Sequence, residues 1–193
     1  TIDKHARMSG TLPSELGGLS LLGSLSLTGN RRISGSIPGS LGAGPLLVSL
    51  ALGNNDALEG ELPAEMGTWD AVQTLYVYQH ARLSGTIPAE LGDMASLLNL
   101  RVYSNLRLSG SLPASVGQLQ ALTYLQLSDQ PVMSGELPLS FYNLSALQTL
   151  NFDGPMGISG TISSQIGAMR ALTYITIDKH ARMSGTLPSE LGG

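Results

Sequence analysis

Cysteine is absent from this 193-residue chain, and charged residues make up only 12% of it. The lack of cysteine excludes disulfides, thiol chemistry and cysteine-ligated zinc or iron–sulfur centres. With a net charge of −4, the chain also lacks the basic stripe that nucleic acid binding requires. No apolar run reaches the length of about 18 residues that a membrane span needs. We therefore expect partners other than nucleic acid, and no membrane insertion in this segment.

Glycine is abundant instead, and it is strictly periodic. Glycines 25 residues apart begin at Gly10 and end at Gly185, and a proline follows three residues after each of them except at Ser163. The unit reads L-x-L-x-x-N-x-x-L-S-G-x-L-P-x-x-L-G-x-L-x-x-L-x-x, without insertion or deletion. It predicts one uncapped array over residues 1–193, with units near 25–49, 50–74, 75–99, 100–124, 125–149 and 150–174 and partial units at 1–24 and 175–193.

Two apolar residues separated by one position open each unit, as in Leu25 and Leu27. This alternation is typical of a strand with one buried face. A single short strand cannot bury that face alone, so the strands of successive units must stack side by side in a parallel sheet. After each proline, segments such as 89–94 supply two apolar contacts within about one helical turn. The pattern predicts an α/β solenoid with short helical or 3₁₀ turns behind the sheet.

Three residues after the second apolar position, the unit favours asparagine, as at Asn30, Asn55 and Asn105. A buried amide there can bond the backbone of adjacent turns, which have no hydrogen-bond ladder of their own. His80, Gln130 and His180 replace asparagine in other units. We predict that these side chains continue the ladder, because histidine and glutamine also form hydrogen bonds.

The segment 83–92, Leu-Ser-Gly-Thr-Ile-Pro-Ala-Glu-Leu-Gly, matches the motif L-x-G-x-[IL]-P-x-x-[IL]-G. This motif resembles the plant-type leucine-rich repeat of receptor-kinase ectodomains and polygalacturonase-inhibiting proteins. The resemblance covers the whole chain, although the unit here is one residue longer than the usual one. It implies a leucine-rich-repeat superhelix with a concave parallel sheet and second short strands at S-G-x-[IL]-P. It also implies an extracellular or cell-surface location and recognition of proteins, peptides or polysaccharides.

A longer period is superimposed on the unit. Residues 1–18 return unchanged as 176–193, an offset of 175 residues or seven units. The identity includes Asp3, Lys4 and His5, which the framework does not fix. Two explanations remain open: a long array of nearly identical seven-unit blocks, which the varied surface residues favour, or an engineered array. Both ends fall within a unit and carry no polar cap, so we expect this segment to belong to a longer array.

The strand positions whose side chains point to solvent are the best candidates for binding a partner. Tyrosine and arginine, which are enriched at binding hot spots, fall on three consecutive predicted strands. The candidate binding residues are Tyr76, Tyr78, Arg101, Tyr103 and Tyr124. The alternative is that these side chains simply stabilise neighbouring strands through cross-strand pairs.

Two weaker features concern other faces. A column of arginines, a candidate site for acidic polysaccharide, is interrupted at Ala57, Val132 and Gly157 and can equally be a solvated surface. Its members are Arg7, Arg32, Arg82, Arg107 and Arg182. Asn143-Leu144-Ser145 is a candidate N-glycosylation sequon, which would make the chain a glycoprotein.

No nucleophile elbow, phosphate-binding loop or metal-ligand spacing occurs, so we predict no catalytic residues, no metal site, no cofactor and no enzyme activity. Two hypotheses remain. The first is a structural segment of a long extracellular filament or surface fibre, in which copies of the chain or further repeats of the same chain pack laterally. The alternative is a recognition ectodomain that binds a peptide, protein or polysaccharide on its concave face.

Overall fold

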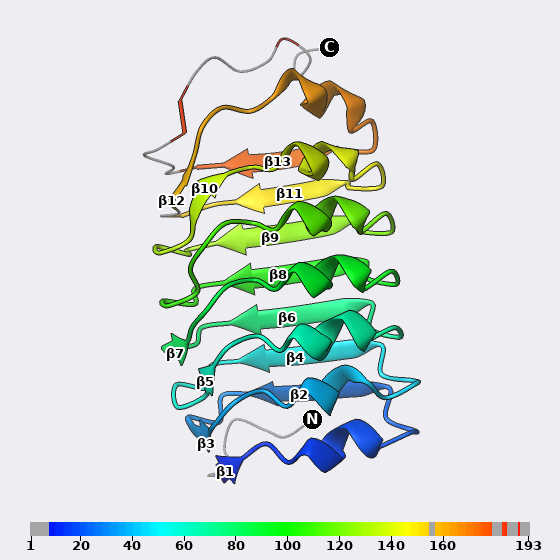
Figure 1. The fold of residues 1–193 in the computed structure, drawn as a ribbon, viewed down its shortest axis with the longest axis vertical. Coiled ribbons are helices and arrows are strands. Elements are labelled where there is room, and N and C mark those ends of the chain that lie inside the picture. The colour runs from blue at the N-terminus through cyan, green and yellow to red at the C-terminus, as the bar shows by residue number, and fades with distance from the viewer. Residues whose placement is uncertain (1–7, 155–156, 179–182, 185–188, 190–193) are drawn as a thin grey trace.

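The computed structural model describes residues 8–154, 157–178, 183–184 and 189, and they form one elongated stack of repeats (Figure 1). A seven-stranded sheet runs through the stack, and every pair of adjacent strands is parallel. Partner residues across it lie 25 positions apart, as Leu50 and Leu75 do. The strands are β2 (Ser24–Thr28), β4 (Ser49–Gly53), β6 (Thr74–Tyr78), β8 (Asn99–Tyr103), β9 (Tyr124–Ser128), β11 (Thr149–Phe152) and β13 (Tyr174–Ile177).

A second row of very short strands follows at the S-G-x-[IL]-P segments, as predicted. They pair in parallel as β1 with β3, β5 with β7 and β10 with β12, and isolated bridges such as Gly35 to Leu58 continue the row. The strands are β1 (Ser9–Thr11), β3 (Arg32–Ser34), β5 (Glu59–Gly60), β7 (Arg82–Leu83), β10 (Ser134–Glu136) and β12 (Gly157–Ser159).

Short 3₁₀ helices complete each turn, and they cover one face of the sheet (Figure 1). Each begins directly after the proline of its unit, or after Ser163 in the last case, and this preceding residue is the N-cap, with an extended backbone. The helices are η1 (Ser14–Gly18), η2 (Gly39–Gly42), η3 (Ala64–Thr68), η4 (Ala89–Asp93), η5 (Ala114–Gln118), η6 (Leu139–Asn143) and η7 (Ser164–Ala168).

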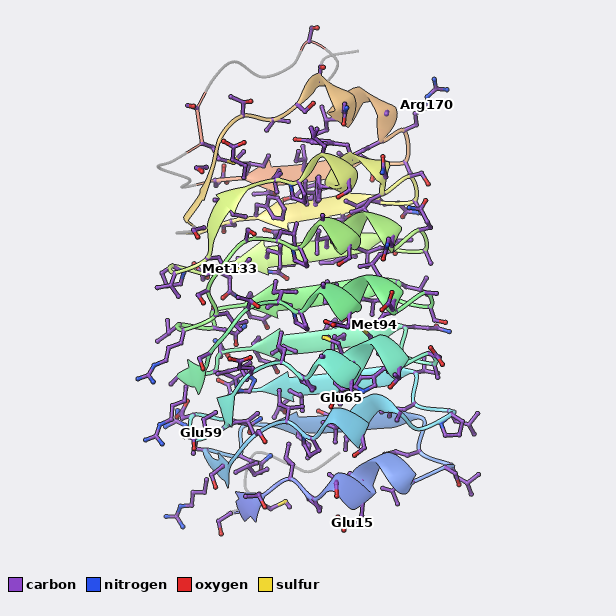
Figure 2. The ribbon with its side chains drawn as sticks, viewed as in Figure 1. Glu15, Glu59, Glu65, Met94, Met133 and Arg170 are labelled. Atoms are coloured by element: carbon purple, nitrogen blue, oxygen red, sulfur yellow. The ribbon has the colours of Figure 1, made fainter. Side chains whose placement is uncertain are left out.

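The core is a single column of apolar side chains between the sheet and the 3₁₀ helices. Leu50, Leu75, Leu100 and Leu125, which open four successive units, are at most 1% exposed. Figure 2 shows Glu65 on the helix side of this column and Glu59 at the edge formed by the second strands. The sheet face that points away from the helices is called the open face below.

The predicted asparagine ladder is present at Asn55 and Asn105, whereas the Asn30 amide donates only to the Thr28 carbonyl of its own turn and its Oδ1 has no partner among the described residues. Asn55 Oδ1 accepts a hydrogen bond from the backbone N–H of Asn30 at 3.0 Å, and its Nδ2 donates to the Leu27 carbonyl at 2.8 Å. Asn105 makes the same two bonds to the preceding repeat, at 3.2 and 3.0 Å. Each of these two amides therefore ties its own turn to the one before it, as the buried position requires.

Gln130 does not continue the ladder. The residue is fully buried, yet neither Oε1 nor Nε2 has a hydrogen-bond partner. The prediction that glutamine would hydrogen-bond here is therefore wrong. Its side chain is one methylene longer than that of asparagine, so its amide does not take the place from which Asn105 bonds the preceding turn. His180, predicted to belong to the same ladder, lies outside the described residues.

His80 replaces the asparagine amide with two ring contacts. Its Nδ1 lies 3.2 Å from the Asn55 carbonyl oxygen, and its Nε2 lies 3.3 Å from the Leu52 carbonyl oxygen. A neutral imidazole donates only one hydrogen, so only one of these contacts is a hydrogen bond in that form. Burial lowers the pKa of His80, although both carbonyls and the charge of Asp56 oppose the change.

We expect the chain to lose stability as the pH falls from about 7.5 to about 5, and His80→Asn to remove part of that loss. In the unfolded chain this histidine gains a proton as the pH falls through 6.5, whereas the buried ring stays neutral until its lower pKa is reached. The free energy of unfolding therefore decreases by up to about 1.4 kcal/mol for each pH unit between the two pKa values. Urea denaturation of both proteins at the two pH values measures the effect. Identical pH dependence of stability in the wild type and in His80→Asn would contradict this prediction.

A column of glycines sets how closely the 3₁₀ helices approach. A β-carbon on Gly117 would lie 2.1 Å from the carbonyl oxygen of Ser140 in the next repeat.

Tyr142 interrupts this column of glycines. It is buried, and its hydroxyl accepts a 2.9 Å hydrogen bond from the backbone N–H of Ser163. Ser163 stands where other units have proline, so only that unit offers this N–H. The Ser163 hydroxyl also accepts a hydrogen bond from the Gln165 N–H, and this bond caps η7 at the position where other units have proline.

Candidate functional site: the tyrosine–arginine cluster

Most of the open face consists of small, uncharged side chains. Arg101 is the only charged residue in the seven described strands of the large sheet. It is surrounded by the four tyrosines that were predicted with it, on β6, β8 and β9. We call these five residues the tyrosine–arginine cluster: Tyr76, Tyr78, Arg101, Tyr103 and Tyr124. The structure therefore brings the predicted binding residues together on one surface.

The Arg101 guanidinium is held between two rings. Its Cζ lies 4.8 Å from the centroid of Tyr76 and 4.4 Å from that of Tyr124. Its Nε donates a 3.3 Å hydrogen bond to Oδ1 of Asn99. Cation–π contacts with both rings restrict the group to one orientation. Within the described part of the chain, no carboxylate forms an ion pair with it. The cluster thus presents a fixed positive charge whose terminal N–H groups can bind an anion.

Tyr78 and Tyr103 form a second pair beside this arginine. Their rings are stacked, with centroids 4.9 Å apart and planes at 10°. The Tyr78 ring leans across Gly53, because a β-carbon on that glycine would lie 2.2 Å from the Tyr78 Cζ. Burial raises the pKa of Tyr103, and Tyr78 raises it further while Arg101 opposes the change. The Tyr103 phenol is therefore a neutral hydrogen-bonding group at physiological pH.

The rim of the open face is built by residues with a left-handed backbone. One such residue follows each of six strands of the sheet. The N–H of each of the first five extends the ladder, as the Asn54 N–H does by donating to the Tyr78 carbonyl at 3.1 Å. The set is Gly29, Asn54, Gln79, Ser104, Asp129 and Gly154. Residues other than glycine cost about 1 kcal/mol or more in this conformation, so four polar side chains are held at the rim against a local backbone penalty.

Two hollows lie along this rim. The first, called the glycine hollow below, has a volume of about 340 Å³ and is lined by Thr28, Gly29, Arg31, Asn54 and Tyr78. The second measures about 230 Å³ and is lined by Asn54, Asp56, Gln79, His80, Ala81, Ser104 and Leu106. Sequence reasoning missed both, because it treated the rim positions as part of a turn. The sequence signal for a hollow was glycine at positions 29 and 53, where other units carry side chains.

Comparison with known proteins decides the family of the fold. No family model and no curated protein matches the chain. Among solved structures, a TDR receptor has a TM-score of 0.86 and 31% identity, covering 95% of this chain and 31% of that one. The plant peptide hormone receptor RGFR1, in complex with RGF2, has a TM-score of 0.72 and 33% identity over 96% and 32% of the two chains. The Arabidopsis receptor kinase HAESA, in complex with the peptide hormone IDA and the co-receptor SERK1, gives 0.69 and 29% over 95% and 34%.

The chain is a leucine-rich-repeat protein with plant-type repeats. It spans about a third of the length of these three receptor chains. The predicted superhelix, with its parallel sheet, second strands and 3₁₀ turns, is confirmed. The extracellular or cell-surface location is also confirmed, because solved neighbours are ectodomains of plant membrane receptors. No helix in the described ranges is long and apolar enough to cross a membrane.

The comparisons favour the second of the two functional hypotheses. The three neighbours described above are receptors or receptor kinases, and none of them is a filament. The filament hypothesis and self-association therefore lack support, while recognition of a protein or peptide gains it. Two of these neighbours, RGFR1 and HAESA, were solved in complex with a ligand. The absence of enzyme activity in this chain stays a prediction.

The two weaker candidate sites lie on other faces of the array. In the arginine column, Arg82 pairs with Glu59 at 3.8 Å, and Arg32 and Arg107 are exposed. Two members lie outside the described residues, namely Arg7 and Arg182. Asn143 ends η6 on the helix side of the array, and its side chain is exposed. Polysaccharide binding by the column and glycosylation of Asn143 both stay predictions.

Proposed function

We propose that this leucine-rich-repeat segment is part of an extracellular recognition ectodomain and binds a peptide or protein segment on its open face. The tyrosine–arginine cluster carries the proposal. It groups four aromatic side chains around the one charged residue in the described strands of the large sheet, and aromatic residues and arginine dominate the energetics of binding interfaces. Receptors of similar fold indicate the class of ligand. The peptide hormone receptor RGFR1 was solved in complex with RGF2, and HAESA was solved in complex with the peptide hormone IDA.

The ligand should present a carboxylate to Arg101. The guanidinium contacts the rings of Tyr76 and Tyr124 on the two neighbouring strands, and its Nε is bonded to Asn99. Only the terminal N–H groups are left for a ligand, and their planar geometry matches a carboxylate. The stacked rings of Tyr78 and Tyr103 then offer an adjacent apolar surface to the neighbouring residues of the same ligand.

A peptide library selected on the purified chain tests this function. We expect the selected peptides to share an Asp, a Glu or a free C-terminus, and Arg101→Gln to weaken their binding by about tenfold to a hundredfold. Tyr103→Leu should weaken binding as well, because it removes the stacked pair. Titration calorimetry of one selected peptide measures both changes.

Arg170→Gln is the matched control, because Arg170 is an exposed arginine just after η7, outside both the large sheet and the arginine column. It should change the affinity by less than about twofold. Circular dichroism should show that all three variants keep the fold. Selected peptides whose affinity is the same in the wild type and in Arg101→Gln would show that the cluster is not the binding site.

A further inference from the structure

We propose that the glycine hollow binds one neutral pyranose unit of a glycan. This site shares Tyr78 with the tyrosine–arginine cluster, but Arg101 is not among its lining residues. It is argued from the shape of the hollow, from its hydrogen-bonding groups and from its charge.

The shape of the hollow results from two missing side chains. Gly29 lines it without contributing a side chain, and Gly53 leaves the space into which the Tyr78 ring leans. The resulting volume is about 340 Å³. This is near the lower limit for small-molecule sites, which is about 300 Å³. A single sugar ring suits a recess of this size, whereas an extended peptide backbone would lie across its mouth.

The lining suits a ring that is apolar on one face and polar around its edge. Tyr78 supplies an aromatic wall against which the C–H face of a pyranose can pack. The Thr28 hydroxyl and the Asn54 amide each donate and accept hydrogen bonds, as sugar hydroxyls also do. An apolar ligand group would find only one partner here, while a pyranose finds partners on both its face and its edge.

The charge of the hollow favours a neutral sugar over an acidic one. Arg31 is its only charged lining residue, and the Nε of this arginine lies 3.4 Å from an Asp56 carboxylate oxygen. The pair leaves the hollow with no net charge. A uronate or sulfated sugar would have to compete with Asp56 for the guanidinium, whereas a neutral ring can bond to the pair as it stands.

The test uses neutral tetrasaccharides built from glucose, mannose, galactose or N-acetylglucosamine, with tetragalacturonate as the acidic counterpart. Binding to the full chain is measured by ligand-observed NMR. We expect at least one neutral tetrasaccharide to bind with a millimolar or lower Kd and tetragalacturonate to bind more weakly. We also expect Gly29→Asn to weaken the neutral sugar by about tenfold or more. Asparagine tolerates the left-handed backbone of Gly29, as Asn54 does at φ 53°, and its amide would occupy the hollow.

Ser104→Asn is the matched control, because it places the same amide on the same left-handed backbone, at φ 55°, outside the glycine hollow. It should leave sugar binding unchanged. Gly29→Asn should also keep its affinity for the acidic peptides that Arg101 binds, which separates failure of this site from failure of the peptide site. The proposal is overturned if no neutral tetrasaccharide binds below about 10 mM. It is also overturned if tetragalacturonate binds most tightly, or if the selected peptides lose affinity in Gly29→Asn.

Discussion

Replacing Gly117 with alanine should destabilise the chain by about 3 kcal/mol or more, although only one methyl group is added. The new β-carbon would lie 2.1 Å from the backbone carbonyl oxygen of Ser140. Backbone in the middle of a stack cannot move away without separating two repeats. The clash must therefore be relieved by opening the contact between η5 and η6, which exposes the apolar column behind them.

Gly18→Ala provides the comparison, since a β-carbon at that position meets no atom within 4 Å. It should shift the urea midpoint very little, whereas Gly117→Ala should lower it strongly. The measurement is urea denaturation followed by far-ultraviolet circular dichroism. Equal midpoints for the two variants would show that the repeats are not held at the spacing described here.

Gln130→Asn should change the free energy of unfolding in the opposite direction and stabilise the chain by roughly 2 to 4 kcal/mol. Two buried polar atoms of Gln130 have no partner, and each unsatisfied group costs about 1 to 3 kcal/mol. Asparagine would bond the N–H of Asn105 and the carbonyl of Val102, as Asn105 itself bonds the preceding repeat. The shorter side chain also leaves a small gap, which reduces the gain.

The control for this gain is Gln148→Asn, which makes the same change at an exposed position. It should stay within about 0.5 kcal/mol of the wild type. Hydrogen exchange adds a local reading, because protection should increase at the amides of Asn105 and its neighbours. No gain in the urea midpoint for Gln130→Asn would show that the buried glutamine is satisfied in solution.

The repetitive part of the fold could be predicted from the sequence because it is fixed by local patterns. The alternation at Leu25 and Leu27 gives the strands, and the fixed spacing of glycine and proline gives the turns. The pairing of Tyr76 with Arg101 followed from the same register, since residues at equivalent positions of consecutive units must be neighbours. Tyr124 is paired with Asn99 instead, and its ring reaches Arg101 diagonally from the adjacent strand.

Features that depend on side-chain length or on the absence of a side chain could not be predicted in this way. Glutamine and asparagine share the same chemistry, so the sequence alone did not reveal that Gln130 would leave the ladder. The glycine hollow arises only when the ring of Tyr78 leans across Gly53. Which way a ring leans is decided by packing between repeats, and the period of the sequence contains no information about it.

The contact between Tyr142 and Ser163 makes the order of the units matter. The phenol needs a backbone N–H in the following unit, and the six units with proline between residues 13 and 138 cannot supply one. Moving either unit elsewhere would leave a buried hydroxyl without its partner or would press a large ring against a proline. A gene rearrangement that separates these two units should therefore destabilise the array, whereas one that moves them together keeps the contact.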